Sequence, residues 1–198
     1  MEAQTLATEA RTPAGKGGAR QLRQHGRVPA VLYGAKGEAV SISVSPKDLT
    51  AAITTPYRRN QLLKLRVDGK EELAVVQDLQ VDPLTRAPMH VDFMRVQEEQ
   101  TIRRPVPLVT SGRAVGVVAG GDLRVLYRSL PVVASPARIP DQIHIDVTPM
   151  QVGDVIRVKD LKLEEGVRVP LPEERNVVTV TQSRRRAAKD GEGEEKAE

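Results

Sequence analysis

Turn-forming residues recur along this chain at a density that argues against long helices. Fourteen prolines and fifteen glycines are spread over 198 residues. Proline removes a backbone donor and glycine frees the local backbone, so this spacing predicts many short elements joined by turns. Three tyrosines and one phenylalanine are the only aromatic residues, and any core must therefore be built from Val, Leu, Ile and Ala. We expect a mainly β fold with few short helices.

Residues 1–97 contain several short runs that are typical of β-strands. The runs are residues 28–33, 39–44, 61–67, 72–81 and 89–96. Asp68-Gly69 lies between two of them and is a strong hairpin signal. Ser45 and Pro46 open a short helix, because serine caps a helix and proline suits its first turn. Five or six strands with few helices predict a small β-barrel or sandwich.

The rest of the chain predicts a second unit and a charged tail. Gln97–Arg104 is polar and precedes Pro105, which indicates an interdomain linker. Residues 105–182 again have short strand-like runs, at 106–110, 125–135, 142–147, 154–158 and 177–181, and we expect the glycines of 112–121 to form turns. Residues 183–198 are charged and of low complexity, so we expect a disordered tail.

One segment near the N-terminus is basic without any acidic residue. It runs between Glu9 and Glu38 and holds Arg11, Lys16, Arg20, Arg23, Arg27 and Lys36. A segment that cannot neutralise itself is suited to an external polyanion. A helical turn would place Arg20 and Arg23 on one side, where guanidinium groups match phosphate oxygens, and the glycines would allow close approach of the backbone. The alternative is a solvated basic loop.

A second candidate site lies on the expected strand 89–96. The period of a strand places His90 and Asp92 on one face and Phe93 on the other, where it would fill the core. A carboxylate accepts hydrogen bonds from guanine amino groups or 2′-hydroxyls, so this face is suited to RNA. A surface ion pair is the alternative. His144 and Asp146 repeat the same spacing, and we assign that second pair to the alternative.

Aromatic residues bear on the kind of RNA that this chain would recognise. Tyr33, at the end of a strand, can stack on a nucleotide or bond to it, although a lone tyrosine there more often packs. Proteins that bind single strands stack bases on aromatic platforms, which this composition does not supply. A folded RNA helix, read by its shape, phosphates and 2′-hydroxyls, fits better.

Other function classes find no support in the residues. The chain has no cysteine and three histidines, with no HExxH zinc motif and no G-x-S-x-G elbow. The glycines of 112–121 lack the Lys-Ser/Thr of a phosphate loop. We therefore expect no enzyme activity, catalytic residue, metal, cofactor or small-molecule substrate. Since no apolar run reaches the ~20 residues of a membrane helix and no signal-peptide pattern opens the chain, we expect a cytoplasmic location without a membrane partner.

Several motifs, taken in order, resemble one protein family. Residues 15–34 read GKGGARQLRQHGRVPAVLYG, and the helix after Ser45, the turn at Asp68-Gly69 and the run His90-x-Asp92-Phe93 follow. Residues 112–123 add the pattern GxAxGVxAGGxL. Together they resemble the bacterial large-subunit ribosomal protein that binds 5S rRNA, the general stress protein CTC family, in its long two-domain form.

The resemblance implies a fold, partners and a set of contact residues. It implies a closed antiparallel β-barrel in residues 1–97, which binds 5S rRNA at an irregular internal loop, and a second β-rich (α+β) domain in residues 105–182. It also implies the large ribosomal subunit and neighbouring ribosomal proteins as partners. The implied RNA-binding residues are Arg11, Lys16, Arg20, Arg23, Tyr33, Gln77, His90 and Asp92.

Two other functions stay open at this point. One is an adaptor for tRNA or a stress RNA, since a related fold occurs in the anticodon-binding region of glutaminyl-tRNA synthetase. The other is a protein-interaction scaffold that acts through the C-terminal domain. The size of the bound RNA tests the first alternative. Deletion of the residues after Val96 tests the second, because an RNA-binding N-terminal fragment would still hold RNA.

Overall fold

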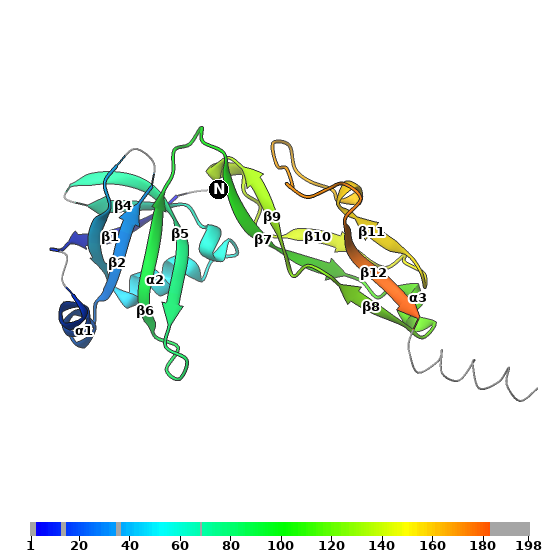
Figure 1. Cartoon of the computed structure of the whole chain (residues 1–198), viewed down its shortest axis with the longest axis horizontal. Helices are drawn as coiled ribbons and strands as arrows, with labels where there is room; N and C mark the ends of the chain where they lie inside the picture. Colours follow the sequence, from blue (N-terminus) through cyan, green and yellow to red (C-terminus); the bar gives the residue numbers. More distant parts are fainter. Residues whose placement is uncertain (1–2, 13–14, 35–36, 68, 183–198) are drawn as a thin grey trace, which may run out of the picture. The chain divides into compact units, whose positions relative to one another are not determined.

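The computed structural model describes residues 3–12, 15–34, 37–67 and 69–182. The predicted tail 183–198 lies outside these residues, as do Lys36 and Asp68. The chain forms two compact units (Figure 1). The first contains the chain up to Arg104 together with Ala134–Asp141, and the second contains Pro105–Val133 and the chain from Gln142 on. Strands dominate both units, as expected.

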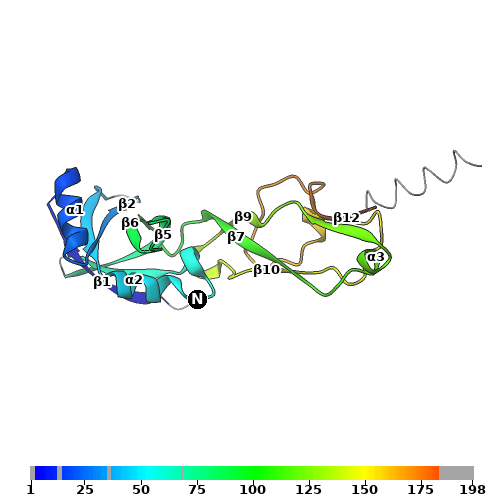
Figure 2. The same cartoon turned by 90° about the horizontal axis from the view of Figure 1, so that it is seen from below.

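Six strands of the first unit close into a barrel in the order β1-β3-β2-β6-β5-β4 (Figures 1 and 2). They are β1 (Gln4–Ala10), β2 (Val28–Tyr33), β3 (Val40–Val44), β4 (Leu63–Val67), β5 (Lys70–Val81) and β6 (Pro88–Arg95). The closed barrel is confirmed, but it is not wholly antiparallel, because β1 pairs with β4 and β2 with β6 in parallel. Both exceptions join strands that are not consecutive in the chain, so no hairpin sets their direction.

Helices and turns of the first unit follow the local sequence signals. The helices are α1 (Lys16–Gln24), α2 (Pro46–Ile53) and the 3-10 turn η1 (Arg58–Asn60). α2 begins after Ser45 as predicted, although the serine side chain makes no capping hydrogen bond. α1 ends at Gln24, and Gly26 follows with a φ of 70°, which suits glycine. The N–H of Gly26 bonds to the carbonyl of Arg23, and the next N–H bonds to that of Leu22.

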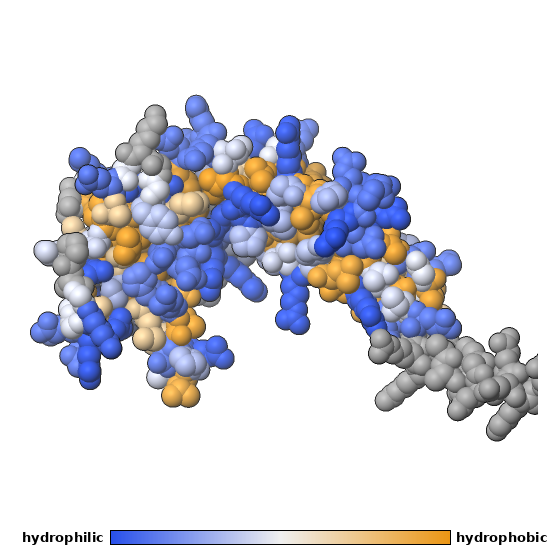
Figure 3. Space-filling view, in the orientation of Figure 1, coloured by the Kyte–Doolittle hydropathy of each residue, from blue (hydrophilic) through white to orange (hydrophobic). Residues whose placement is uncertain are grey.

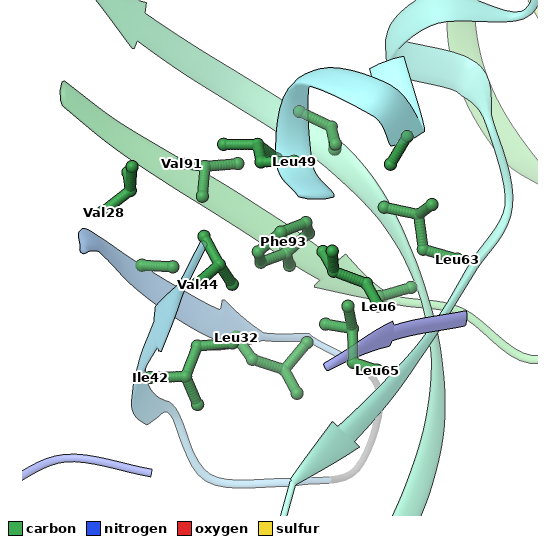
Figure 4. Packing of buried hydrophobic residues seen from close by; sticks show 14 of the residues in the cluster. Leu6, Val28, Leu32, Ile42, Val44, Leu49, Leu63, Leu65, Val91 and Phe93 are labelled. Atoms are coloured by element: carbon green, nitrogen blue, oxygen red, sulfur yellow. The ribbon is translucent and has the colours of Figure 1, made fainter. Parts of the chain in front are cut away.

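Strand alternation fills the barrel with aliphatic side chains. Leu63, Leu65 and Val67 are buried while Lys64 and Arg66 between them are exposed, as the period of two in a strand requires. Phe93 is fully buried among these side chains, and α2 lies close to them at Leu49 (Figure 4). Full burial of such a side chain contributes roughly 1.5–3 kcal/mol to stability. The packed core therefore fixes the strands of the barrel, and with them the side chains on its outer face.

The second unit consists of two three-stranded sheets, in the orders β10-β7-β9 and β11-β12-β8. The strands are β7 (Ile102–Ser111), β8 (Gly121–Val125), β9 (Ser129–Ala134), β10 (Ile143–Asp146), β11 (Val155–Arg157) and β12 (Asn176–Gln182). The short helix is α3 (Val115–Val118), and the 3-10 turns are η2 (Pro136–Arg138) and η3 (Val158–Asp160). Two expectations were wrong: the run 125–135 is divided between β8 and β9, and the expected linker Gln97–Arg104 includes the start of β7.

Candidate nucleic-acid interface

Helix α1 carries three of the six basic residues of the segment between Glu9 and Glu38. Lys16 and Arg20 are exposed one turn apart, and the side chain of neither forms a hydrogen bond or ion pair with another described residue. Arg23 is half-buried, and its Nη1 donates to the backbone carbonyl of Met89 on β6 at 3.4 Å. No carboxylate lies in the first turn of α1. The helix thus presents uncompensated positive charge while Arg23 ties it to β6.

Two other arginines of the basic segment bond within the protein. The Nε of Arg11 donates to the carbonyl of Ile42 on β3 at 3.1 Å. Arg27 forms an ion pair with Glu9 at 2.5 Å, and its guanidinium also lies 3.4 Å from the hydroxyl of Ser43. The segment is therefore partly neutralised by Glu9 at its own edge, which its lack of internal acidic residues did not predict.

The outer face of β2 and β6 brings three predicted residues together. Nδ1 of His90 lies 2.8 Å from Oδ1 of Asp92, and both side chains are half-buried. Tyr33 lies near them on the parallel neighbour β2. Partial burial raises the pKa of Tyr33, and the charges of Asp92 and Asp78 raise it further. The tyrosine hydroxyl is thus protonated at neutral pH and can donate a hydrogen bond.

Gln77 extends this face onto β5 through a bulge. The register passes from Val76 opposite Phe93 to Asp78 opposite Asp92, so Gln77 is an extra residue with no partner on β6. A bulge of this kind bends the strand and changes the direction of its side chains. Gln77 is exposed, and its Oε1 accepts a hydrogen bond from Arg104 at the start of β7.

Sequence reasoning missed three residues that support this face. Arg104, at the start of β7, donates Nη1 to Oε1 of Gln77 at 2.6 Å and is buried. Arg59 lies 3.4 Å from Asp78 in an ion pair beside it. Arg104 stood in a polar run that resembled a linker, and no periodicity marked it. Asp78 follows the bulge, which a strand pattern alone does not locate.

The second His-x-Asp pair behaves differently from the first. Oδ1 of Asp146 accepts hydrogen bonds from the backbone N–H of Thr148 at 2.9 Å and from its hydroxyl at 2.6 Å. These bonds hold the pKa of Asp146 below its usual value. Asp146 makes no ion pair with His144 within the described part of the chain. The spacing alone therefore does not define a site, and Asp146 serves a turn.

Hydrophilic side chains gather over α1, and hydrophilic side chains interspersed with apolar ones cover the face formed by β2, β6 and β5 (Figure 3). The structure thus brings Tyr33, Gln77, His90 and Asp92 onto one outer face of the barrel, which we call the polar wall, and Arg23 joins α1 to it. Among the described residues no cluster of three metal-binding side chains occurs. No helix in that same part of the chain is long and apolar enough to cross a membrane.

Comparison with known proteins identifies the family. Residues 6–93 match the Ribosomal L25p family, and residues 101–184 match the C-terminal domain of ribosomal protein TL5. The large ribosomal subunit protein bL25 of Anaeromyxobacter dehalogenans (strain 2CP-1 / ATCC BAA-258) is 43% identical over 168 residues, which are 85% of this chain and 70% of that protein. The bL25 of Anaplasma marginale (strain Florida) is 39% identical over 193 residues, 95% of this chain and 88% of that protein.

The chain belongs to the bL25 family. It is therefore a ribosomal protein of the large subunit and not an enzyme. The family expected from the motifs is confirmed, and the two matched regions confirm the long, two-domain form. The bL25 of Syntrophotalea carbinolica (strain DSM 2380 / NBRC 103641 / GraBd1), 40% identical over 84% of this chain and 81% of that protein, agrees with this assignment.

Proposed function

We propose that the first unit binds 5S rRNA at an irregular internal loop of a helical segment, and so holds the protein in the large subunit in the cytoplasm. One observation supports this most directly. Arg23 of α1 bonds to the carbonyl of Met89, the residue before His90. The cationic helix and the polar wall are thereby joined side by side, as a surface must be if it contacts both phosphates and groove edges of one RNA helix.

The two parts of this surface have different roles. Lys16, Arg20 and Arg11 supply charge for phosphates, which sets the register of the protein on the helix. The second part supplies hydrogen-bond donors and acceptors rather than positive charge. The carboxylate of Asp92 would repel a phosphate but accepts from a 2′-hydroxyl or a guanine amino group, and Tyr33 and Gln77 add hydrogen bonds beside it. Such a mixture favours a groove edge over a bare backbone.

A mobility-shift titration with 5S rRNA across a salt series tests the proposal. The wild-type chain should form a complex that weakens as salt rises, because bound phosphates release counterions. Replacing Lys16 and Arg20 by alanine together should weaken binding and reduce the salt slope by about 1–2. Lys47→Ala on α2, which also removes an exposed lysine of the first unit, should leave both unchanged. A double variant with wild-type affinity and slope would exclude α1 from the interface.

A competition experiment separates 5S rRNA from the other RNA classes. Labelled 5S rRNA bound to the full chain is challenged with unlabelled 5S rRNA, with mixed tRNA and with a regular RNA duplex of equal length. Only unlabelled 5S rRNA should displace the probe at comparable concentration, since shape recognition needs the irregular loop. Equal displacement by tRNA would favour the adaptor function instead.

A further inference from the structure

Arg104 is the one charged residue that is buried in the described part of the chain, with 3% of its surface exposed. Its Nε donates to Oδ1 of Asn60 at 3.0 Å and its Nη1 to Oε1 of Gln77 at 2.6 Å. Its Nη2 donates to the carbonyls of Arg59, at 3.0 Å, and Val76. All of these acceptors are neutral oxygens. Burying a cation without a carboxylate partner costs desolvation free energy. We therefore expect Arg104 to have a function other than packing.

These bonds converge on the bulge of β5. Val76 is the last residue before the bulge and Gln77 is the extra residue, and Arg104 bonds to both. The guanidinium therefore satisfies a carbonyl next to the break in the ladder and fixes the rotamer of the exposed amide. Because Oε1 of Gln77 is turned toward the guanidinium, the NH2 group of the amide is the part left to donate to an approaching molecule.

We propose that Arg104 is a positioning residue for RNA recognition: it locks the bulge so that Gln77 presents a donor beside the acceptors of Asp78 and Asp92. This inference rests on the proposed function. Arg104 cannot contact RNA itself because its side chain is enclosed. A planar guanidinium with donors in a fixed fork suits this task, because it holds several oxygens in one geometry.

Arg104 lies in the part of the chain that the second family match covers. The residue lies beyond the region 6–93 that matches the Ribosomal L25p family and within the region 101–184 that matches the TL5 C-terminal domain. The hydrogen bonds of its side chain are nevertheless all to residues of the first unit. The RNA-facing wall of this chain thus takes one support from the segment that the second family match covers.

Full-length variants at two adjacent arginines test the proposal by titration with 5S rRNA. Arg104→Met should weaken binding about tenfold, within the range of coupling between neighbouring residues of one hydrogen-bond network, with an unchanged salt slope because no phosphate contact is removed. Arg104→Lys, which keeps the charge but not the fork, should lie between. Arg103→Met removes the same charge from the exposed neighbouring residue and should stay within about twofold, as surface changes usually do. Tight binding by a folded Arg104→Met protein would overturn the inference.

A double-mutant cycle distinguishes positioning from general stability. If Arg104 acts through Gln77, then Gln77→Ala should cost little more in the Arg104→Met background, because the amide is already misplaced there. If the reductions in affinity of the two single variants multiply in the double variant, the two residues act independently and the idea is refuted. Should Arg104→Met melt far below the wild type, the same cycle is read with Arg104→Lys.

A readout without RNA keeps this inference separate from the proposed function. In two-dimensional NMR spectra, Arg104→Met should shift the side-chain amide of Gln77 and the backbone amide of Asp78, and Arg103→Met should not. Unmoved signals would contradict the role of Arg104 whatever the RNA result. If instead the wild-type chain itself fails to bind 5S rRNA, the proposed function fails while the NMR comparison still decides whether Arg104 positions the bulge.

Discussion

Asp92 carries the charge that least suits a surface for a polyanion, which makes it an informative residue to change. We expect Asp92→Ala to weaken 5S rRNA binding by roughly 1–3 kcal/mol, by analogy with contacts to base edges. The salt slope should not change, because a carboxylate neutralises no phosphate. Mobility shifts at several salt concentrations measure both quantities. The matched control is Asp146→Ala, which removes the same side chain from the other His-x-Asp pair. Tighter binding by Asp92→Ala would mean that the carboxylate only repels RNA.

For single residues, the sequence predicted side-chain orientation well and long-range partners poorly. The alternation in β6 placed Phe93 inside and His90 and Asp92 outside, and the structure confirms this. The bond from Arg104 to Gln77 joins residues 27 positions apart and leaves no periodic trace. Such a contact depends on the closed barrel, which brings η1 and the β5 bulge to one place. Local patterns therefore located the wall but not the residue that braces it.

Among the elements, the hairpin between β5 and β6 depends on one carboxylate. Oδ1 of Asp82 accepts hydrogen bonds from the N–H groups of Leu84 at 2.9 Å and Thr85 at 2.8 Å. These bonds hold the pKa of Asp82 below its usual value, and the bond from Thr85 has the larger effect. A lowered pKa stabilises the folded state above the usual carboxyl pKa, and this contribution is lost as the pH falls through the folded value.

Asp82→Ala should therefore lower the melting temperature of the first unit at neutral pH by a few degrees. The difference from the wild type should shrink as the pH falls below the usual carboxyl range and through the lowered pKa of Asp82, because the wild-type side chain becomes protonated there and its bonds weaken. Thermal melts from neutral to acid pH, followed by circular dichroism, measure this. A difference that stays constant over that range would show that the carboxylate charge does not hold the turn.

Element recognition failed where the apolar signal was thin. β1 was not predicted, and in it only Leu6 is buried. The remaining side chains face outward or are half-buried, so the run lacks the repeated alternation that marks β4. The missing strand also accounts for one of the two unexpected parallel pairings, that of β1 with β4. A barrel closed by such a strand cannot be distinguished from an open sheet by periodicity.

For the whole molecule, the two family matches and the two compact units divide the chain at different residues. The matches leave a gap between residues 93 and 101, whereas the first unit runs to Arg104 and includes Ala134–Asp141. A fragment that ends after Val96 lacks Arg104, although it contains every strand of the barrel. Comparing this fragment with one that includes Arg104 therefore tests both RNA binding by the barrel and the role of Arg104.

We expect a fragment of residues 1–104 to bind 5S rRNA within about threefold of the full chain. A fragment of residues 1–96 should bind about tenfold more weakly, because the bulge then lacks its bonds to Arg104. Neighbouring residues of one hydrogen-bond network are coupled by this order of magnitude. Both fragments lack Pro136, which is buried in the first unit, so both should melt below the full chain and must be compared below their melting temperatures. Equal affinities would leave Arg104 without a role in binding. Failure of both fragments to bind, while the full chain still binds, would instead assign recognition to residues beyond 104 and favour a function carried by the second unit.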